Sequence, residues 1–114
     1  MSSQTETIQI LCIIPARSGS KGIPDKNIKL YNGVPLIGHS ILQAKKSKYY
    51  RKMRIILSTD SEYYASIGQK YGAEVPFLRP TEFSGDLSSD YECINHCVNW
   101  LKENQDYYPV LVFC

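Results

Sequence analysis

Hydrophobic and polar positions follow two patterns along the chain: continuous apolar runs, and stretches with apolar residues at helical spacing. The apolar runs at residues 8–15, 54–58 and 109–113 predict strands, and a shorter run at 74–77 predicts a further one. A run without polar alternation is typical of a strand that is covered on both faces. The pattern therefore predicts four largely buried strands.

The stretches between these runs predict three helices, over residues 35–48, 61–71 and 89–104. Pro35 suits a first helical turn, and Gly72 stands where a helix end favours a left-handed residue. Ser89 and Glu92 have the spacing of a capping box at the start of the third helix. Each helix thus has a boundary signal of its own.

Two polar residues in or near these helices can be explained by structural roles alone. Asp60 is well placed to cap the second helix, and this interpretation stands beside a role in binding a substrate. His39 lies inside the first helical pattern, and we expect it to be structural. Neither residue by itself predicts a site.

Strands that alternate with helices predict an α/β protein, a Rossmann-like three-layer α/β/α fold with a mainly parallel sheet. A length of 114 residues predicts a single domain over residues 1–114. Ligands of such sheets bind beyond the carboxyl ends of the strands. Three loops reach that edge, at residues 17–27, 58–61 and 79–86.

The predicted strand at 109–113 carries almost no polar residue to protect a sheet edge. Two interpretations follow. Either the protein oligomerises there, or the sequence is a truncated form, the front part of a longer protein.

Composition narrows the function classes. With 43% hydrophobic residues and 21% charged residues the chain is not typical of a disordered protein. A formal net charge of +2 is too small to predict nucleic-acid binding by bulk electrostatics. No apolar stretch approaches the roughly 20 residues that cross a membrane, and MSSQTET at the start does not read as a secretory signal.

Four cysteines without C-x-x-C spacing favour a reduced, cytoplasmic setting. Cys12 and Cys114 lie in apolar runs and are expected to be buried thiols. Cys93, His96 and Cys97 could suggest a metal site, but their spacing also fits the apolar face of one helix. We favour the structural interpretation of this cluster and predict no metal ligand.

The loop after the first strand carries the densest charge. Its cations are Arg17, Lys21, Lys26 and Lys29, and with Asp25 as the one acid the local net charge is +3. Gly19 and Gly22 allow the backbone to approach a ligand closely. Arginine forks, lysine point charges and a nest of backbone N–H groups together suit a polyphosphate. The loop is not a Walker A motif, and a solvated basic loop is the alternative.

The stretch IIPARSGSKGIPDKN at residues 13–27 resembles the nucleotide-binding loop of the CMP-sialic acid synthetases, the acylneuraminate cytidylyltransferases. The resemblance continues through GVPLIGHSI at 33–41, STD at 58–60 and GAEVPFLRPTEFSGD at 72–86. It therefore covers the chain from about residue 10 onward. It implies the fold of nucleotide-diphospho-sugar transferases and a nucleotide-binding domain that is the N-terminal part of a larger one.

The resemblance also implies a reaction. The anomeric hydroxyl of a nine-carbon sugar acid such as N-acetylneuraminate attacks the α-phosphate of CTP, and pyrophosphate leaves with the assistance of Mg²⁺. Arg17 and Lys26 are implied as the catalytic cations on the triphosphate, with Lys21 close by. Asn27 either holds the loop or contacts the nucleotide. The full implied nucleotide-binding set is Ala16, Arg17, Ser20, Lys21, Lys26, Asn27, Arg79 and Ser89.

Arg79 in the motif LRP matches the family arginine that lies near the cytosine. An arginine there can donate to the cytosine O2 atom while the main chain accepts from the N4 amine. The bland alternative for Arg79 is an exposed charge that tethers its loop.

Family members are longer than this chain. Beyond the stretch that matches VLVFC they carry a further active-site loop, Mg²⁺-binding acids, a sugar-acid pocket and a segment through which dimers form. Acids near the predicted sheet edge are Asp25, Asp60, Glu82 and Asp86, and no motif marks two of them as Mg²⁺ ligands. We therefore expect weak CTP binding and little turnover from these residues alone. The alternatives are a non-catalytic nucleotide-binding module and an oligomerising remnant of such an enzyme.

Overall fold

The computed structural model describes residues 10–17, 26–48, 50–80 and 90–113. The elements of the first half are β1 (Ile10–Pro15), η2 (Lys26–Ile28), β2 (Leu30–Tyr31), β3 (Val34–Pro35) and α1 (Leu36–Lys45). Those of the second half are η3 (Tyr50–Lys52), β4 (Met53–Ser58), α2 (Glu62–Lys70), α3 (Asp90–Gln105) and β5 (Leu111–Phe113).

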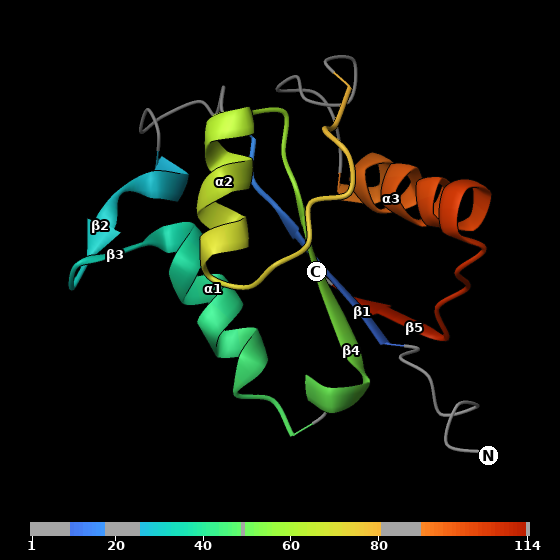
Figure 1. Cartoon of the computed structure of the whole chain (residues 1–114), viewed down its shortest axis with the longest axis horizontal. Coiled ribbons are helices and arrows are strands. Elements are labelled where there is room, and N and C mark those ends of the chain that lie inside the picture. The colour runs from blue at the N-terminus through green and yellow to red at the C-terminus, as the bar shows by residue number, and fades with distance from the viewer. Residues whose placement is uncertain (1–9, 18–25, 49, 81–89, 114) are drawn as a thin grey trace.

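The described strands form a three-stranded parallel sheet in the order β4-β1-β5 (Figure 1). The pairing of β1 with β4 runs over the full length of both strands, from Ile10 opposite Met53 to Pro15 opposite Ser58. The pairing of β1 with β5 covers the first three residues of β1. Among the described strands, the short β5 lies at an edge of the sheet. The prediction of a buried strand at 109–113 is wrong in this respect, because Val110 and Leu111 are 76% and 53% exposed at that edge.

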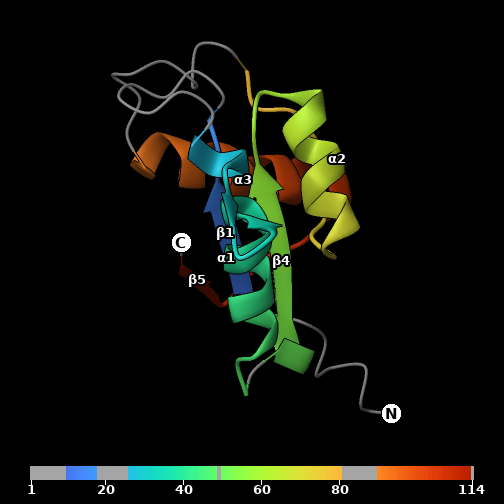
Figure 2. The same cartoon turned by 90° about the vertical axis from the view of Figure 1, so that its left-hand side faces the viewer.

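Helices cover both faces of this sheet. α1 and α2 lie on one face and α3 lies on the other (Figures 1 and 2). Alternate residues of β1 point to the two sides, so Cys12 joins the core under α1 and α2, whereas Leu11 and Ile13 join the core under α3. The predicted three-layer α/β/α fold is confirmed.

The predicted strand at 74–77 is wrong in extent, because it is reduced to one parallel bridge between Glu74 and Ile56. Glu74 donates its N–H to the carbonyl of Ile55 and accepts from the N–H of Leu57. Two residues later Pro76 has no N–H to donate, so the ladder cannot continue by the same pattern. The side chain of Arg54 reinforces the single bridge by a two-point ion pair with Glu74.

The hairpin of β2 and β3 was not predicted from the sequence. Its turn residues Asn32 and Gly33 have φ angles of 54° and 80°, and Asn-Gly is the strongest short signal for such a tight turn. Pro35 accordingly ends β3 and forms the N-cap of α1 instead of its first turn.

His39 on α1 is structural, as expected, because its Nε2 lies 2.7 Å from the carbonyl oxygen of Tyr31 in the hairpin.

The ends of α2 correct one prediction and confirm another. Ser61, and not Asp60, is the N-cap, since its Oγ accepts from the N–H of Tyr64 at 3.1 Å. Gly72 has a φ of 103° just beyond the helix, which confirms its predicted role. The predicted cap Ser89 of α3 lies outside the described residues.

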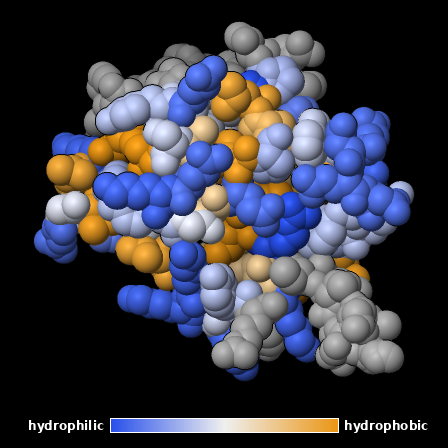
Figure 3. Space-filling view, viewed as in Figure 1, coloured by the Kyte–Doolittle hydropathy of each residue, from blue (hydrophilic) through white to orange (hydrophobic). Residues whose placement is uncertain are grey.

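The surface over α1, α2 and the hairpin shows hydrophobic side chains among hydrophilic ones (Figure 3). Exposed apolar residues of these elements include Leu30 and Leu42. Such scattered exposure is normal for a folded domain. None of the helices in the described ranges has the length and apolar character needed to cross a lipid bilayer.

The contact of α2 with β4 gives a test of the fold. A Cβ atom added at Gly68 would lie 2.6 Å from the Cδ2 atom of Leu57, a fully buried side chain. We expect Gly68→Ala to lower the free energy of unfolding by about 1–2 kcal/mol, because overpacking outweighs the helix propensity that alanine adds. Urea denaturation measures the change. Gln69→Ala, at an exposed neighbouring position, is the control and should be neutral or stabilising.

Candidate functional site

The carboxyl ends of β1 and β4 finish side by side. Pro15 pairs with Ser58, and the N–H of the next residue, Ala16, donates to the carbonyl of Ser58 at 2.9 Å. One residue further on, the carbonyl of Thr59 accepts from the N–H of Arg79 at 2.8 Å. These backbone hydrogen bonds thus bring together the starts of the predicted ligand loops at 17–27 and 79–86, both beside the loop at 58–61.

The base of the charged loop is closed by a side chain. The amide Nδ2 of Asn27 donates to the carbonyl of Arg17 at 3.3 Å, and these two residues flank the loop on either side. This hydrogen bond agrees with the first role implied for Asn27, and a contact with the nucleotide stays a prediction. Ala16 is almost fully buried at 1% exposure, whereas the Arg17 side chain is half-buried.

The predicted site residues differ in how much of each the structure describes. Ala16, Arg17, Asn27 and Arg79 are described, and the hydrogen bonds above tie them to one edge of the sheet. Lys26 is placed by its backbone at the start of η2. Ser20, Lys21 and Ser89 lie outside the described residues. The positions of those three side chains therefore remain predictions.

Arg79 differs from its bland interpretation as an exposed charge. Only 6% of the residue is exposed, and its Nε atom is buried with no hydrogen-bond partner among the described residues. A buried donor on a charged group that lacks an acceptor is unfavourable. This donor would be satisfied by an acceptor atom of a bound molecule.

Aromatic side chains of α3 hold the segment that leads to Arg79. Phe77 lies edge-to-face against His96, with ring centroids 4.9 Å apart, and its centroid is 5.1 Å from that of Trp100. Burial, and then the positive charge of Arg79, lower the pKa of His96 from its usual 6.5. The role of His96 beside Arg79 was missed from the sequence, where this histidine was considered only with the cysteines of the same helix.

The cysteines of α3 are core residues, as favoured from the sequence. Cys93 and Cys97 are at most 1% exposed and belong to the hydrophobic cluster beneath α3. The Sγ–H of Cys93 donates to the Oγ of Ser58 at 3.4 Å, which links the helix to the end of β4. Within the described ranges no group of three or more His, Cys, Asp or Glu side chains could hold a metal ion.

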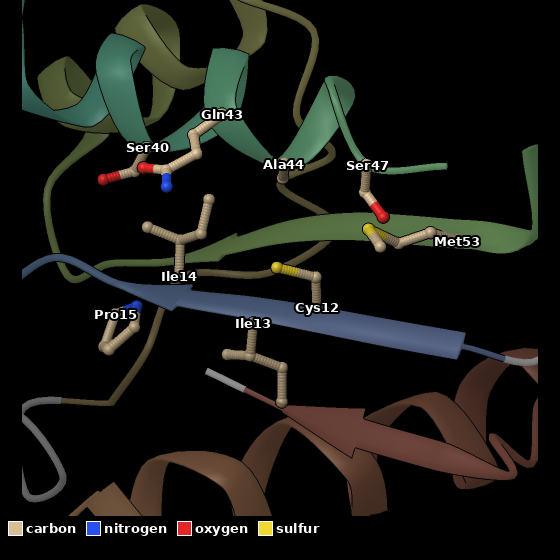
Figure 4. A pocket seen from close by; sticks show the side chains of 9 residues that line it. All are labelled: Cys12, Ile13, Ile14, Pro15, Ser40, Gln43, Ala44, Ser47 and Met53. Atoms are coloured by element: carbon tan, nitrogen blue, oxygen red, sulfur yellow. The ribbon is translucent and has the colours of Figure 1, made fainter. Parts of the chain in front are cut away.

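A cavity of about 490 Å³ lies between β1 and α1 (Figure 4). Cys12 and Ile14 point toward it from the strand, while Ser40 and Gln43 face it from the helix. Burial raises the pKa of the Cys12 thiol, so this predicted buried cysteine is a poor nucleophile. None of the residues predicted to contact a nucleotide lines this cavity, and we assign no ligand to it.

The sequence of this chain is similar to those of known proteins. A family model described as "Cytidylyltransferase" matches residues 11–108. The chain is 49% identical over 81 residues to a CMP-N,N'-diacetyllegionaminic acid synthase of Campylobacter jejuni, a match over 71% of this chain and 34% of that protein. It is 41% identical over 97 residues to an N-acylneuraminate cytidylyltransferase of Streptococcus agalactiae, over 85% of this chain and 23% of that protein.

Two further similarities agree with these. A pseudaminic acid cytidylyltransferase of Campylobacter jejuni is 41% identical over 98 residues, which are 86% of this chain and 41% of that protein. A solved cytidylyltransferase structure from Leptospira borgpetersenii superposes with a TM-score of 0.58 at 19% identity, over 86% of this chain and 38% of that one. This likeness supports the fold. The chain spans less than half of the length of each relative.

The lowered pKa of His96 predicts a pH dependence of stability. The unfolded chain takes up a proton on this residue near pH 6.5, and the folded chain does so only at lower pH. Stability from the neutral imidazole is therefore complete above pH 6.5 and is lost as the pH falls below it. Urea denaturation at pH 7.5 and pH 5.5 should show a smaller loss for His96→Gln than for the natural chain. An equal loss of stability in His96→Gln and the natural chain would contradict the claim that protonation of His96 destabilises the fold.

Proposed function

The chain belongs to the cytidylyltransferase family, and we propose that it forms the CTP-binding part of an enzyme that makes CMP-activated nonulosonic acids. Three relatives carry names of this kind, for legionaminic, N-acylneuraminic and pseudaminic acids. The proposed substrate class is therefore a nine-carbon sugar acid of the sialic acid type. Residues that the longer relatives carry beyond the matched region would supply the rest of the active site.

One observation carries the proposal. The hydrogen bonds from Ala16 to Ser58 and from Arg79 to Thr59 join the charged loop and the arginine segment at the ends of neighbouring parallel strands. Sheets of this kind bind nucleotides beyond the carboxyl ends of their strands. The triphosphate would lie on the loop, and the cytosine would lie toward Arg79.

The reaction needs little covalent chemistry from the protein. An anomeric hydroxyl oxygen of the sugar acid forms a bond to the α-phosphorus of CTP, and the bond between that phosphorus and the oxygen that bridges it to the β-phosphate breaks. The hydroxyl proton is released, and pyrophosphate carries away the electron pair of the broken bond. The protein has to hold the nucleophile in line and neutralise the charge on the leaving group.

The cations of the loop would do this work. Arg17 can bind phosphate oxygens through its planar fork, while Lys21 and Lys26 contribute point charges. Asn27 supports this role indirectly, because its hydrogen bond to the carbonyl of Arg17 holds the loop closed at its base.

The buried guanidinium of Arg79 suits the base. Its Nε donor lacks an acceptor among the described residues, and the O2 atom of cytosine is such an acceptor. A neighbouring main-chain carbonyl that accepts from the N4 amine would then separate cytosine from uracil. Arg79 would thus contribute to recognition of the base, while Arg17 contributes to recognition of the phosphates.

Mg²⁺ is expected from the family, and when bound it would neutralise charge on the triphosphate. The described residues by themselves do not form a set of acidic ligands for it, since Asp60 is the only carboxylate among the acids considered near the sheet edge that falls in the described ranges. We therefore assign no Mg²⁺ ligand.

We further propose that the protein is located in the cytoplasm and forms a homodimer. The free thiols of Cys12 and Cys93 fit a reducing compartment.

The loop assignment predicts a loss of CTP binding in Arg17→Ala. We expect the affinity to fall at least about tenfold, since a charge-assisted phosphate contact is removed. Isothermal titration of the 114-residue chain with CTP measures the change. Lys52→Ala removes an exposed cation from the opposite end of β4 and should bind CTP as the natural chain does. Unchanged affinity in Arg17→Ala would mean that the loop does not hold the triphosphate.

A further inference from the structure

The segment of residues 77–79 is fixed at two points that belong to different layers of the fold. At one end Phe77 packs between His96 and Trp100 of α3. At the other end the N–H of Arg79 donates to the carbonyl of Thr59, just after β4. Leu78 between them is 42% exposed, so the segment is anchored at its two ends and not at its middle residue.

The contact between Phe77 and His96 has a defined geometry. Their ring planes meet at 86°, and this edge-to-face arrangement is favourable beyond the area that it buries. Phe77 also packs against the hydrophobic cluster beneath α3, which includes Cys93 and Cys97. A shift of the imidazole would therefore move Phe77, and with it the backbone two residues before the arginine.

The positive charge of Arg79 also acts on His96. Burial, and then the charge of the guanidinium, disfavour a proton on the imidazole and lower its pKa. Arg79 is only 6% exposed, so a second cation beside its guanidinium would repel it in a region that water screens poorly. A neutral ring at position 96 avoids this repulsion. Position 96 thus requires both an aromatic shape and the absence of charge.

We propose that His96 is a positioning residue for nucleobase binding, which it supports by holding Phe77 and the buried guanidinium of Arg79 at the edge of the sheet. This inference rests on the proposed function, because it assumes that Arg79 contacts the base. It adds that the face of α3 that contacts Phe77, through His96 and Trp100, controls the base-dependent part of nucleotide affinity. Affinity for the phosphates alone would not depend on His96.

The chain contains its own reporter for this test. Trp100 is the single tryptophan, and its ring contacts Phe77. Its indole N–H gives one signal in a ¹H–¹⁵N NMR spectrum, and titrations can follow that signal together with the backbone amides. CTP engages both the phosphate and the base regions, whereas inorganic tripolyphosphate engages the phosphate region alone. The ratio of the two affinities measures the contribution of the nucleoside.

Three variants separate the possibilities. His96→Ala should lower CTP affinity about fivefold and leave tripolyphosphate affinity within about twofold. His96→Phe keeps a neutral ring against Phe77 and should restore most of the CTP affinity. His96→Lys places a cation beside Arg79 and should lower CTP affinity at least as much as alanine does. His96→Gln replaces His96→Ala in the comparison if the alanine variant is insoluble.

Each outcome bears on a defined claim. If the natural chain binds CTP no better than tripolyphosphate, the proposed base site is wrong, and the role of His96 falls with it. If CTP binds better but His96→Ala keeps the natural ratio of affinities, the base site stands and the inference about His96 is overturned. The inference is also overturned if His96→Ala weakens both ligands equally, since that result indicates a purely structural role.

Discussion

The parallel register of β1 with β4 is the constraint on which the rest of the structure depends. Because Pro15 lies opposite Ser58, both strands end at the same level, and the residues that follow them are neighbours. The hydrogen bond from Ala16 to the carbonyl of Ser58 extends this pairing by one step beyond the strands. A shift by one residue would turn alternate side chains of β1 to the wrong face and would separate the two loops.

Each layer of the fold contributes a different part of the candidate site. The sheet brings the loop ends together, and Asn27 closes the charged loop on the carbonyl of Arg17. α3 is held to the end of β4 through Cys93 and Ser58. Phe77 then uses the same helix as its support, and so does the approach to Arg79. The predicted site residues lie mostly in loops, but helices and strands on opposite sides determine where the described ends of those loops lie.

Sequence patterns predicted the features that depend on local chemistry. Apolar runs predicted the two buried strands β1 and β4, and the positive φ of Gly72 follows from its place after a helix. Features that depend on long-range packing were harder to predict from the sequence. Pro76 shortened a predicted strand to one bridge, since a missing N–H matters only once the partner strand is known. The burial of Arg79 and its closeness to His96 arise where two distant segments meet, and no spacing rule encodes that meeting. The Asn-Gly hairpin, by contrast, carried a local signal that was overlooked.

The central claim is that a nucleotide binds where the carboxyl ends of β1 and β4 meet. Backbone amide shifts of the ¹⁵N-labelled chain during a CTP titration test it most directly. The account predicts that the largest shifts fall on Ala16, Arg17, Thr59 and Arg79, with little change at the opposite end of the sheet, around Met53 and Leu111. Shifts concentrated at that opposite end, or along the cavity between β1 and α1, would contradict it.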